Sequence, residues 1–253
     1  MNLSTAHHWP LLTALCSLFL APLSAAPVEL VDESPVEISA PDKQTLLIDF
    51  GRVAFGNLEL TLPEGAQAPI TVHFGEALKN GRIDRKPPGT VRYNFTKVEP
   101  DGRTSVIAAP PADGRNTELA SPSGRGHPPA ILTPEEWGVI LPFRWVEIEG
   151  WPGRMESDQI KRRSAFLAAW NDSSASFQSS DETLNRIWDL CRYSIKATTF
   201  AGLYVDGDRE RIPYEADAYL NQLSHYYTDN DIEIARDTID HLLLNPTLSL
   251  IHI

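Results

Sequence analysis

The spacing of apolar residues changes once along this chain, near residue 180, and this change limits the fold more than any other feature. Before it, short runs alternate apolar and polar side chains, and turn sequences such as Pro-Glu-Gly and Pro-Asp-Gly separate them. The clearest runs are TLLIDFG (45–51), GNLELTL (56–62), PITVHFGE (69–76), VRYNFTKV (91–98) and FRWVEIEGW (143–151). Short alternating runs separated by turns are typical of an antiparallel sandwich. We therefore predict a β-sandwich domain over residues 27–170.

After residue 180 apolar residues recur at steps of three and four, the spacing of one helical face. Ser180 and Asp181 are suitable N-caps for a helix from about 182 to 200. A second helix is predicted to begin near Pro213, and a third after the pair Asp229 and Asn230. Three helices are too few to close an all-α domain. The predicted fold class is thus an antiparallel β-sandwich, a linker at 171–181 and the first helices of an all-α domain over 182–253.

Each predicted helix has an apolar stripe, and three such helices without the rest of an all-α domain are expected to leave an apolar face uncovered. In the first helix the stripe consists of Leu184, Ile187, Trp188, Cys191 and Ile195. In the second it consists of Ala216, Leu220, Leu223 and Tyr227. In the third it consists of Ile232, Ala235, Ile239, Leu242 and Leu243.

The two ends of the chain carry separate signals. Trp9 to Leu23 form an apolar run too short to span a bilayer, and three small residues ending at Ala26 follow it. This pattern predicts a signal peptide over residues 1–26 and a periplasmic or secreted protein, the alternative being a buried N-terminal helix. Residues 248–253, LSLIHI, are apolar and carry no helix-ending signal. We expect the natural protein to continue beyond them, the alternative being an ordinary terminus.

Charge and cysteine content exclude several classes of partner. Asp and Glu total 34 against 22 for Lys and Arg, a formal net charge of -12 that repels a phosphate backbone. No nucleic-acid partner is therefore expected, and no membrane contact once the signal peptide is removed. No spacing of Cys and His suggests zinc, so neither a metal nor another cofactor is predicted. Loss of Cys16 with the signal peptide would leave Cys191 alone, without an internal disulfide.

The segment YVDGDRERIPYEADAYLNQ, residues 204–222, concentrates the chemistry of the chain. It holds the carboxylates Asp206, Asp208, Glu210, Glu215 and Asp217, together with Arg209, Arg211 and three tyrosines. Carboxylates can bind sugar hydroxyls while aromatic rings cover the C–H face, and glycosidic cleavage needs two carboxyl groups beside the bond. Crowded like charges also raise the pKa of one carboxyl, as a general acid requires.

Three other interpretations of this segment stay open on spacing alone. Acids in the first turn of a helix, such as Glu215 and Asp217, complement the helix dipole. The acids can also pair with the neighbouring arginines on a solvated loop. The spacing partly fits a calcium-binding loop, but Arg211 occupies the position that requires glycine.

The segment DGDRERIPYEADAYLNQ resembles the catalytic motif of the bacterial α-L-rhamnosidases, six-hairpin glycosidases whose commoner form reads D-C-P-x-R-D/E-E/K-x-G-W-x-G-D. The resemblance covers most of the chain after residue 26. GRVAFGNLELTL, VHFGEALKNGRI and FRWVEIEGWPG are similar to sandwich segments of that family, and SFQSSDETLNRIWDLCRYSI is similar to its first toroid helix. The resemblance implies that residues 182–253 are the N-terminal part of an (α/α)6 toroid. It also implies an inverting glycosidase that removes terminal rhamnose from glycans or glycosides.

The resemblance assigns roles by matching positions. Glu210 matches the general acid, and Asp206 and Asp217 match acids that hold sugar hydroxyls. Arg209 matches an arginine that orients a carboxylate or the substrate, and Tyr214 stands where the family has the tryptophan that shapes the sugar pocket.

The chain departs from the family motif in two places. The Cys-Pro pair after the first aspartate is replaced by Gly207, and the Gly-Trp pair by Pro213 and Tyr214, so the exact sugar is open. The family's general base is a later glutamate that we do not identify among these 253 residues, so this chain alone is expected to be inactive. The alternative is a non-catalytic carbohydrate-binding or scaffold module with a structural acidic loop.

Overall fold

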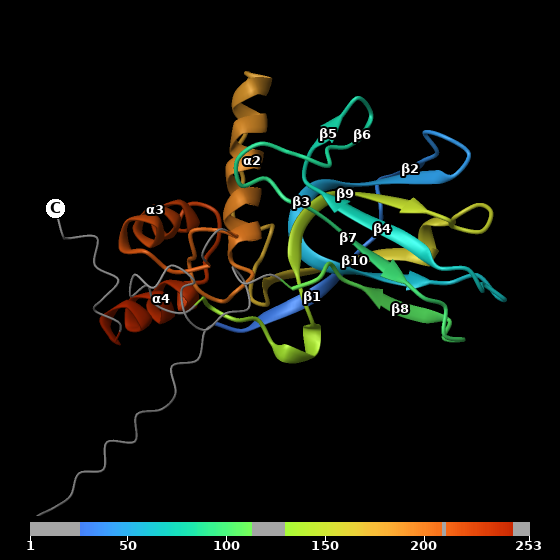
Figure 1. Cartoon of the computed structure of the whole chain (residues 1–253). Helices are drawn as coiled ribbons and strands as arrows, with labels where there is room; N and C mark the ends of the chain where they lie inside the picture. The colour runs from blue at the N-terminus through green and yellow to red at the C-terminus, as the bar shows by residue number, and fades with distance from the viewer. Residues whose placement is uncertain (1–25, 113–129, 209–210, 245–253) are drawn as a thin grey trace, which may run out of the picture.

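The computed structural model describes residues 26–112, 130–208 and 211–244. An antiparallel sheet domain precedes three helices, and α2 stands between the strands and the pair α3 and α4 (Figure 1). The predicted fold class, a β-sandwich followed by the first helices of a helical domain, is confirmed. Most of the predicted signal peptide and the C-terminal LSLIHI lie outside the described residues. Within the described ranges, no helix combines the length and the hydropathy of a membrane span.

In its described residues, the sheet domain contains ten strands and two short 3-10 helices. The strands are β1 (Val28–Glu33), β2 (Glu37–Ser39), β3 (Thr45–Thr61), β4 (Ile70–Gly75), β5 (Leu78–Lys79), β6 (Arg82–Ile83), β7 (Tyr93–Val98), β8 (Ser105–Ala108), β9 (Leu141–Glu149) and β10 (Ile160–Leu167). The 3-10 helices are η1 (Glu135–Trp137) and η2 (Ser157–Gln159). The runs predicted as separate strands at 45–51 and 56–62 form the single strand β3, because no chain reversal occurs between them.

Strand β3 organises the sheet by pairing at both of its ends. The main order is β1-β10-β3-β9-β4-β7, and β2 and β8 also pair with β3. The first part of β3 pairs with β2 and β9, and its last part pairs with β10 and β8. Between these parts the register with β9 shifts from Asp49 to Ala54, and Gly51 adopts a φ of 79°. Such an irregularity bends a strand, so β3 can contribute to both sides of one core.

One core cluster joins the two parts of β3. Ile48 and Phe50 from its first part and Leu58 and Leu60 from its last part belong to the same buried cluster, which also includes Phe143 of β9. The four residues of β3 have even numbers, and within each part of the strand neighbouring core residues are two positions apart, as expected for one face of a strand with period two. Full burial of each such side chain contributes about 1.5–3 kcal/mol. The alternation read from the sequence is therefore the alternation between core and outer face.

The three helices lie where the spacing of apolar residues predicts them. They are α2 (Glu182–Thr198), α3 (Glu215–His225) and α4 (Glu233–Leu244). Asp181 caps α2, since its side chain accepts a hydrogen bond from the Thr183 backbone N–H at 2.8 Å. The side chain of Asp172, in the predicted linker, forms ion pairs with Arg192 and Lys196 of α2. These contacts hold the chain after β10 against the first helix.

The apolar stripes of the three helices are largely exposed. In α2 and α3, Leu184, Ile187, Leu220 and Leu223 are exposed, and so is Tyr227 just after α3. Ile232 before α4 and Ile239 and Leu243 within it are exposed as well. Cys191 and Ala216 are also exposed. Of the predicted stripes only Ile195 and Ala235 are buried, whereas α3 buries Ala218 and His225 instead. A helix buries the face that its neighbours cover, and no described element covers these stripes. The apolar face predicted to stay uncovered is therefore exposed.

Candidate active site

The segment between α2 and α3 is seated on the sheet domain. Phe200, Leu203 and Val205 form a buried cluster with Phe55 of β3 and Ala165 of β10. The rings of Phe55 and Phe200 stack with centroids 3.7 Å apart. Burial of these side chains fixes the backbone that leads into the acidic residues. The acidic segment is therefore held by strands that lie far from it in the sequence.

Asp206 closes a short loop at the base of the acidic segment. Its backbone N–H donates to the Ile212 carbonyl at 3.1 Å, and its Oδ1 accepts from the Ile212 N–H at 3.1 Å. The predicted general acid Glu210 and the predicted substrate ligand Arg209 belong to this loop but lie outside the described residues. The two hydrogen bonds between Asp206 and Ile212 thus hold the two ends of this loop together.

Asp208 lies in a buried ion-pair cluster with two arginines. Its Oδ1 is 3.0 Å from Nη2 of Arg211, and its Oδ2 accepts from Nε of Arg92, 116 residues away in the sequence. Nη2 of Arg211 also donates to the Ile140 carbonyl at 2.8 Å, and its guanidinium lies over the Phe200 ring. Arg211 has a φ of 56°, a left-handed conformation that these contacts must stabilise. For Asp208, this cluster matches the interpretation in which the acids of the segment form ion pairs with arginines, because two arginines contact its carboxylate.

Glu76, after β4, is a carboxyl group of the site that the sequence analysis missed. Its Oε1 accepts a hydrogen bond from the Arg92 backbone N–H at 2.5 Å. Burial raises the pKa of Glu76, and the negative charge of Asp208 raises it further. No local signal marks this residue, because its position beside the acidic segment depends on contacts across more than a hundred residues.

A groove of about 660 Å³ lies between α2 and the sheet domain, and residues of the acidic segment help to line it. Asp206 and Asp208 belong to this lining, together with Glu76. Arg52 of β3 and Tyr193 of α2 also line it. The volume is in the range of pockets that hold small ligands. The structure therefore combines Asp206, a predicted substrate ligand, with groups of the sheet domain.

The two remaining predicted ligands lie at the start of α3, outside the lining of this groove. Tyr214 occupies the N-cap position, where its carbonyl accepts from the Ala218 N–H at 2.7 Å. Asp217 is exposed in the first turn, and it is one of two acids there that complement the helix dipole. Between them, Oε2 of Glu215 is buried and has no hydrogen-bond partner among the described residues. The described residues therefore bring Asp206 and Asp208 together but leave Asp217 apart from the groove.

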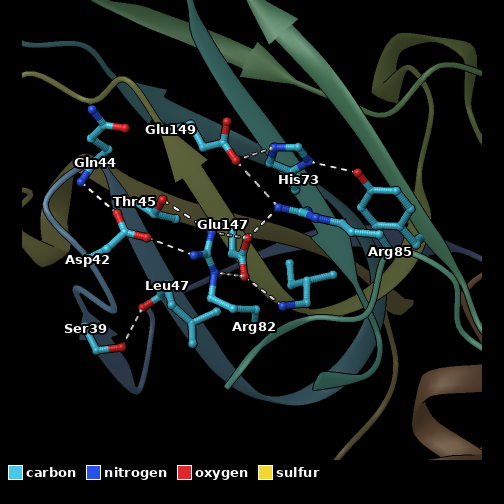
Figure 2. Close-up of polar contacts among 12 residues, drawn as sticks. Ser39, Asp42, Gln44, Thr45, Leu47, His73, Arg82, Arg85, Glu147 and Glu149 are labelled. Carbon is cyan, nitrogen blue, oxygen red and sulfur yellow. Dashed lines mark hydrogen bonds and ion pairs between the residues drawn. The ribbon is translucent and has the colours of Figure 1, made fainter. Parts of the chain in front are cut away.

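A second polar cluster lies on the outer face of the sheet, around the buried carboxylate of Glu147 on β9 (Figure 2). Nε of Arg82 donates to Glu147 Oε1 at 2.9 Å, the Ile83 N–H donates to the same atom at 2.7 Å, and Arg85 also contacts the carboxylate. Burial opposes ionisation of Glu147, but the hydrogen bonds from Arg82 and Ile83 outweigh it and lower the pKa. A charged, fully paired carboxylate of this kind fixes the β5–β6 hairpin on β9 rather than exchanging protons. Among the described residues, no group of three metal-ligating side chains occurs.

Two family models match the chain. The bacterial alpha-L-rhamnosidase concanavalin-like domain matches residues 39–166, just over half of the chain. The bacterial alpha-L-rhamnosidase 6 hairpin glycosidase domain matches residues 172–245. A search of curated proteins gives no match.

Solved structures with a similar fold are α-L-rhamnosidases. The enzyme from Dictyoglumus thermophilum gives a TM-score of 0.63 at 17% identity, over 87% of this chain and 22% of that chain. The GH78 family rhamnosidase of Bacillus sp. GL1 gives 0.52 at 19% identity, over 80% of this chain and 18% of that chain. A Klebsiella oxytoca rhamnosidase with rhamnose bound gives 0.52 at 14% identity, over 85% of this chain and 44% of that chain. The chain thus spans less than half the length of these relatives. The match to both family models, in the order of the two domains of the chain, shows that it belongs to the bacterial α-L-rhamnosidase family.

Proposed function

We propose that this chain is part of an inverting α-L-rhamnosidase that removes terminal rhamnose from glycans or glycosides. The observation that carries the proposal is that Asp206 lines a ligand-sized groove and lies four residues before Glu210 in the sequence. In this proposal Glu210 protonates the departing glycosidic oxygen, and Asp206 and Asp217 hold sugar hydroxyls. Arg209 orients a carboxylate or the sugar. Tyr214 takes the place of the family tryptophan that shapes the sugar pocket. No cofactor takes part, since inverting hydrolysis needs only an acid, a base and water.

Export to the periplasm or the medium is part of the same proposal. Its support is the apolar run before Ala26 and the small residues that end it. A glycosidase outside the cytoplasm meets polymeric glycans that do not cross membranes. N-terminal sequencing of the protein recovered from its natural host would test this part, and an unprocessed Met1 would contradict it.

The alternative function, a non-catalytic carbohydrate-binding or scaffold module, is favoured by one observation. Asp208 is paired with both Arg92 and Arg211, so at least one acid of the segment has a structural role. This pairing concerns neither Asp206 nor Glu210. The two functions differ in what they predict for turnover, because a binding module holds rhamnose without cleaving its glycosides.

The test is an assay of the longest gene product that contains these residues, with 4-nitrophenyl α-L-rhamnoside as substrate. We expect release of rhamnose, and proton NMR should show the β-anomer first, as inversion requires. Glu210→Gln should reduce the rate, and Glu64→Gln, a change in a sheet-domain loop, should not. Sugar binding without turnover would favour the alternative function. Release of the α-anomer first would contradict the inverting mechanism.

A further inference from the structure

We propose that the groove between α2 and the sheet domain binds the sugar unit to which the terminal rhamnose is attached. The inference rests on the proposed function, which places rhamnose at Asp206. Because Asp206 lines the groove, a rhamnose bound at Asp206 would place its attached unit in the same groove. The sheet domain would then select the substrate as well as support the helices.

The groove is long enough for such a unit. Its lining residues on α2 run from Arg186 to Thr198, a span of about 18 Å at the rise of an α-helix. The opposite wall comes from the sheet domain, where Gly51, Arg52 and Pro142 line it. Figure 1 shows α2 standing beside the sheet domain, which supplies the other lining residues.

Several polar side chains in the groove are held in place by partners. Arg144 donates two hydrogen bonds to Asp49, from Nε and Nη2, each at 2.7 Å. The Tyr193 hydroxyl donates to the Val53 carbonyl at 3.0 Å, and the Arg52 guanidinium lies 4.7 Å from the centroid of the Tyr193 ring. Groups fixed before binding lose little conformational entropy when a ligand arrives. The walls are therefore largely preorganised.

The composition of the groove favours a neutral sugar over an anionic one. Arg52, Arg144 and Arg186 line it, together with Asp189, Asp206 and Asp208. Arg52 pairs with Asp189 and Arg144 with Asp49, whereas Asp208 pairs with Arg92 and Arg211. Glu76 adds no positive charge in either protonation state. The apolar side chains Val53, Phe55, Pro142, Leu190 and Ala197 offer surface for the C–H groups of a ring. No excess of positive charge remains to attract a uronate.

The experiment compares the binding of two ligands to the 253-residue chain by NMR titration: L-rhamnose, and rutinose, a neutral disaccharide of rhamnose and glucose. We expect rutinose to bind about tenfold more tightly than rhamnose, as one additional set of contacts would produce. Ala197→Trp fills the groove, and it should abolish this difference without weakening the binding of rhamnose. Ser194→Trp, at an exposed position in the same lining, should do the same if the first variant does not fold.

Thr183→Trp is the matched control, because Thr183 is exposed on α2 outside the groove. It should preserve the preference for rutinose. The inference is overturned if rhamnose binds but rutinose binds no more tightly, or if the preference survives both groove variants or is equally lost in the control. If neither sugar binds to the unsubstituted chain, the sugar site at Asp206 itself fails, and this outcome counts against the proposed function.

Discussion

Asp208 and Arg92 show how a buried charge at the junction of sheet and helices depends on a distant partner. Their side chains are only 11% and 9% exposed. Arg92→Met should lower the free energy of unfolding by about 3 kcal/mol, since it leaves a buried carboxylate with one cation fewer. Arg103→Met is the control, because Arg103 pairs with Asp101 on the surface, where solvent screens the pair, and its loss should change stability much less. Urea denaturation of both variants measures the difference, and equal losses would refute a special role for Arg92.

The proposed role of Glu210 can be separated from that of Asp217 by the leaving group of the substrate. A general acid protonates the departing oxygen, so Glu210→Gln should lower kcat by about 10²–10⁴-fold with a poor leaving group and much less with an activated aryl one. Asp217→Asn should reduce both rates to a similar degree if Asp217 only holds hydroxyls. Steady-state kinetics on both substrates measure this. Equal losses in the Glu210 variant would remove it from the acid role.

His225 makes stability depend on pH. Burial lowers its pKa below the usual 6.5, and the nearby negative charges of Asp229 and Asp231 only partly oppose this. Tyr204, whose hydroxyl lies 2.5 Å from Nδ1, and the stacked ring of Trp170 complete its surroundings. His225 therefore binds a proton more readily in the unfolded chain than in the folded chain. As a result, the free energy of unfolding should fall as pH falls below about 6.5.

His225→Gln should make the dependence of unfolding free energy on pH less steep. Part of the dependence should remain, because burial also lowers the pKa values of His73 and His241. Tyr204→Phe is the control: it removes a hydrogen-bond partner and should lower stability without flattening the slope. Denaturation midpoints measured between about pH 5.5 and 7 provide the comparison. An unchanged slope in the His225 variant would show that other groups set the dependence.

At the scale of elements, the close approach of β3 and β10 explains why Gly56 occupies the middle of a strand. A Cβ atom added at Gly56 would lie 2.4 Å from the Arg163 carbonyl oxygen, which belongs to the backbone and cannot turn away. Gly56→Ala should therefore lower the free energy of unfolding by about 3 kcal/mol. Thr61→Ala, at the exposed end of β3, should change it by less than about 0.5 kcal/mol. Thermal denaturation of the two variants measures this, and a stable Gly56 variant would show that the strands can separate slightly.

In the helices, contacts with neighbouring elements determine which face is buried. Ile195 is buried, while Leu190 on the same helix is 64% exposed. In α3, His225 is fully buried, while Tyr227 just beyond the helix is 75% exposed. The stripes that the sequence predicts are real, but among the described residues they lie on the outside.

At the scale of the whole molecule, the sheet domain and the helices share a core. Phe200 is fully buried, and its ring stacks on Phe55 of β3. Phe200→Ala should therefore lower the stability of the sheet as well as of the helices, by about 3–5 kcal/mol. Exchange of backbone amide hydrogens in β3 and α2 reports on the two parts separately. Faster exchange in α2 alone would mean that the two parts unfold independently. Phe177→Ala, at an exposed position in the segment before α2, is the control.

The sequence by itself determined the order of a β-sandwich and a helical domain, the start of each helix and the acidic segment. These features depend on spacing within a few residues, where the period of two or of 3.6 follows from local backbone geometry. Only the tertiary structure decided that two apparent strands are the single strand β3, and that Arg92 and Glu76 meet Asp208. It also decided which helical faces are covered. Such contacts join residues more than a hundred positions apart, and chain folding places them through turns and loops whose paths no local pattern encodes.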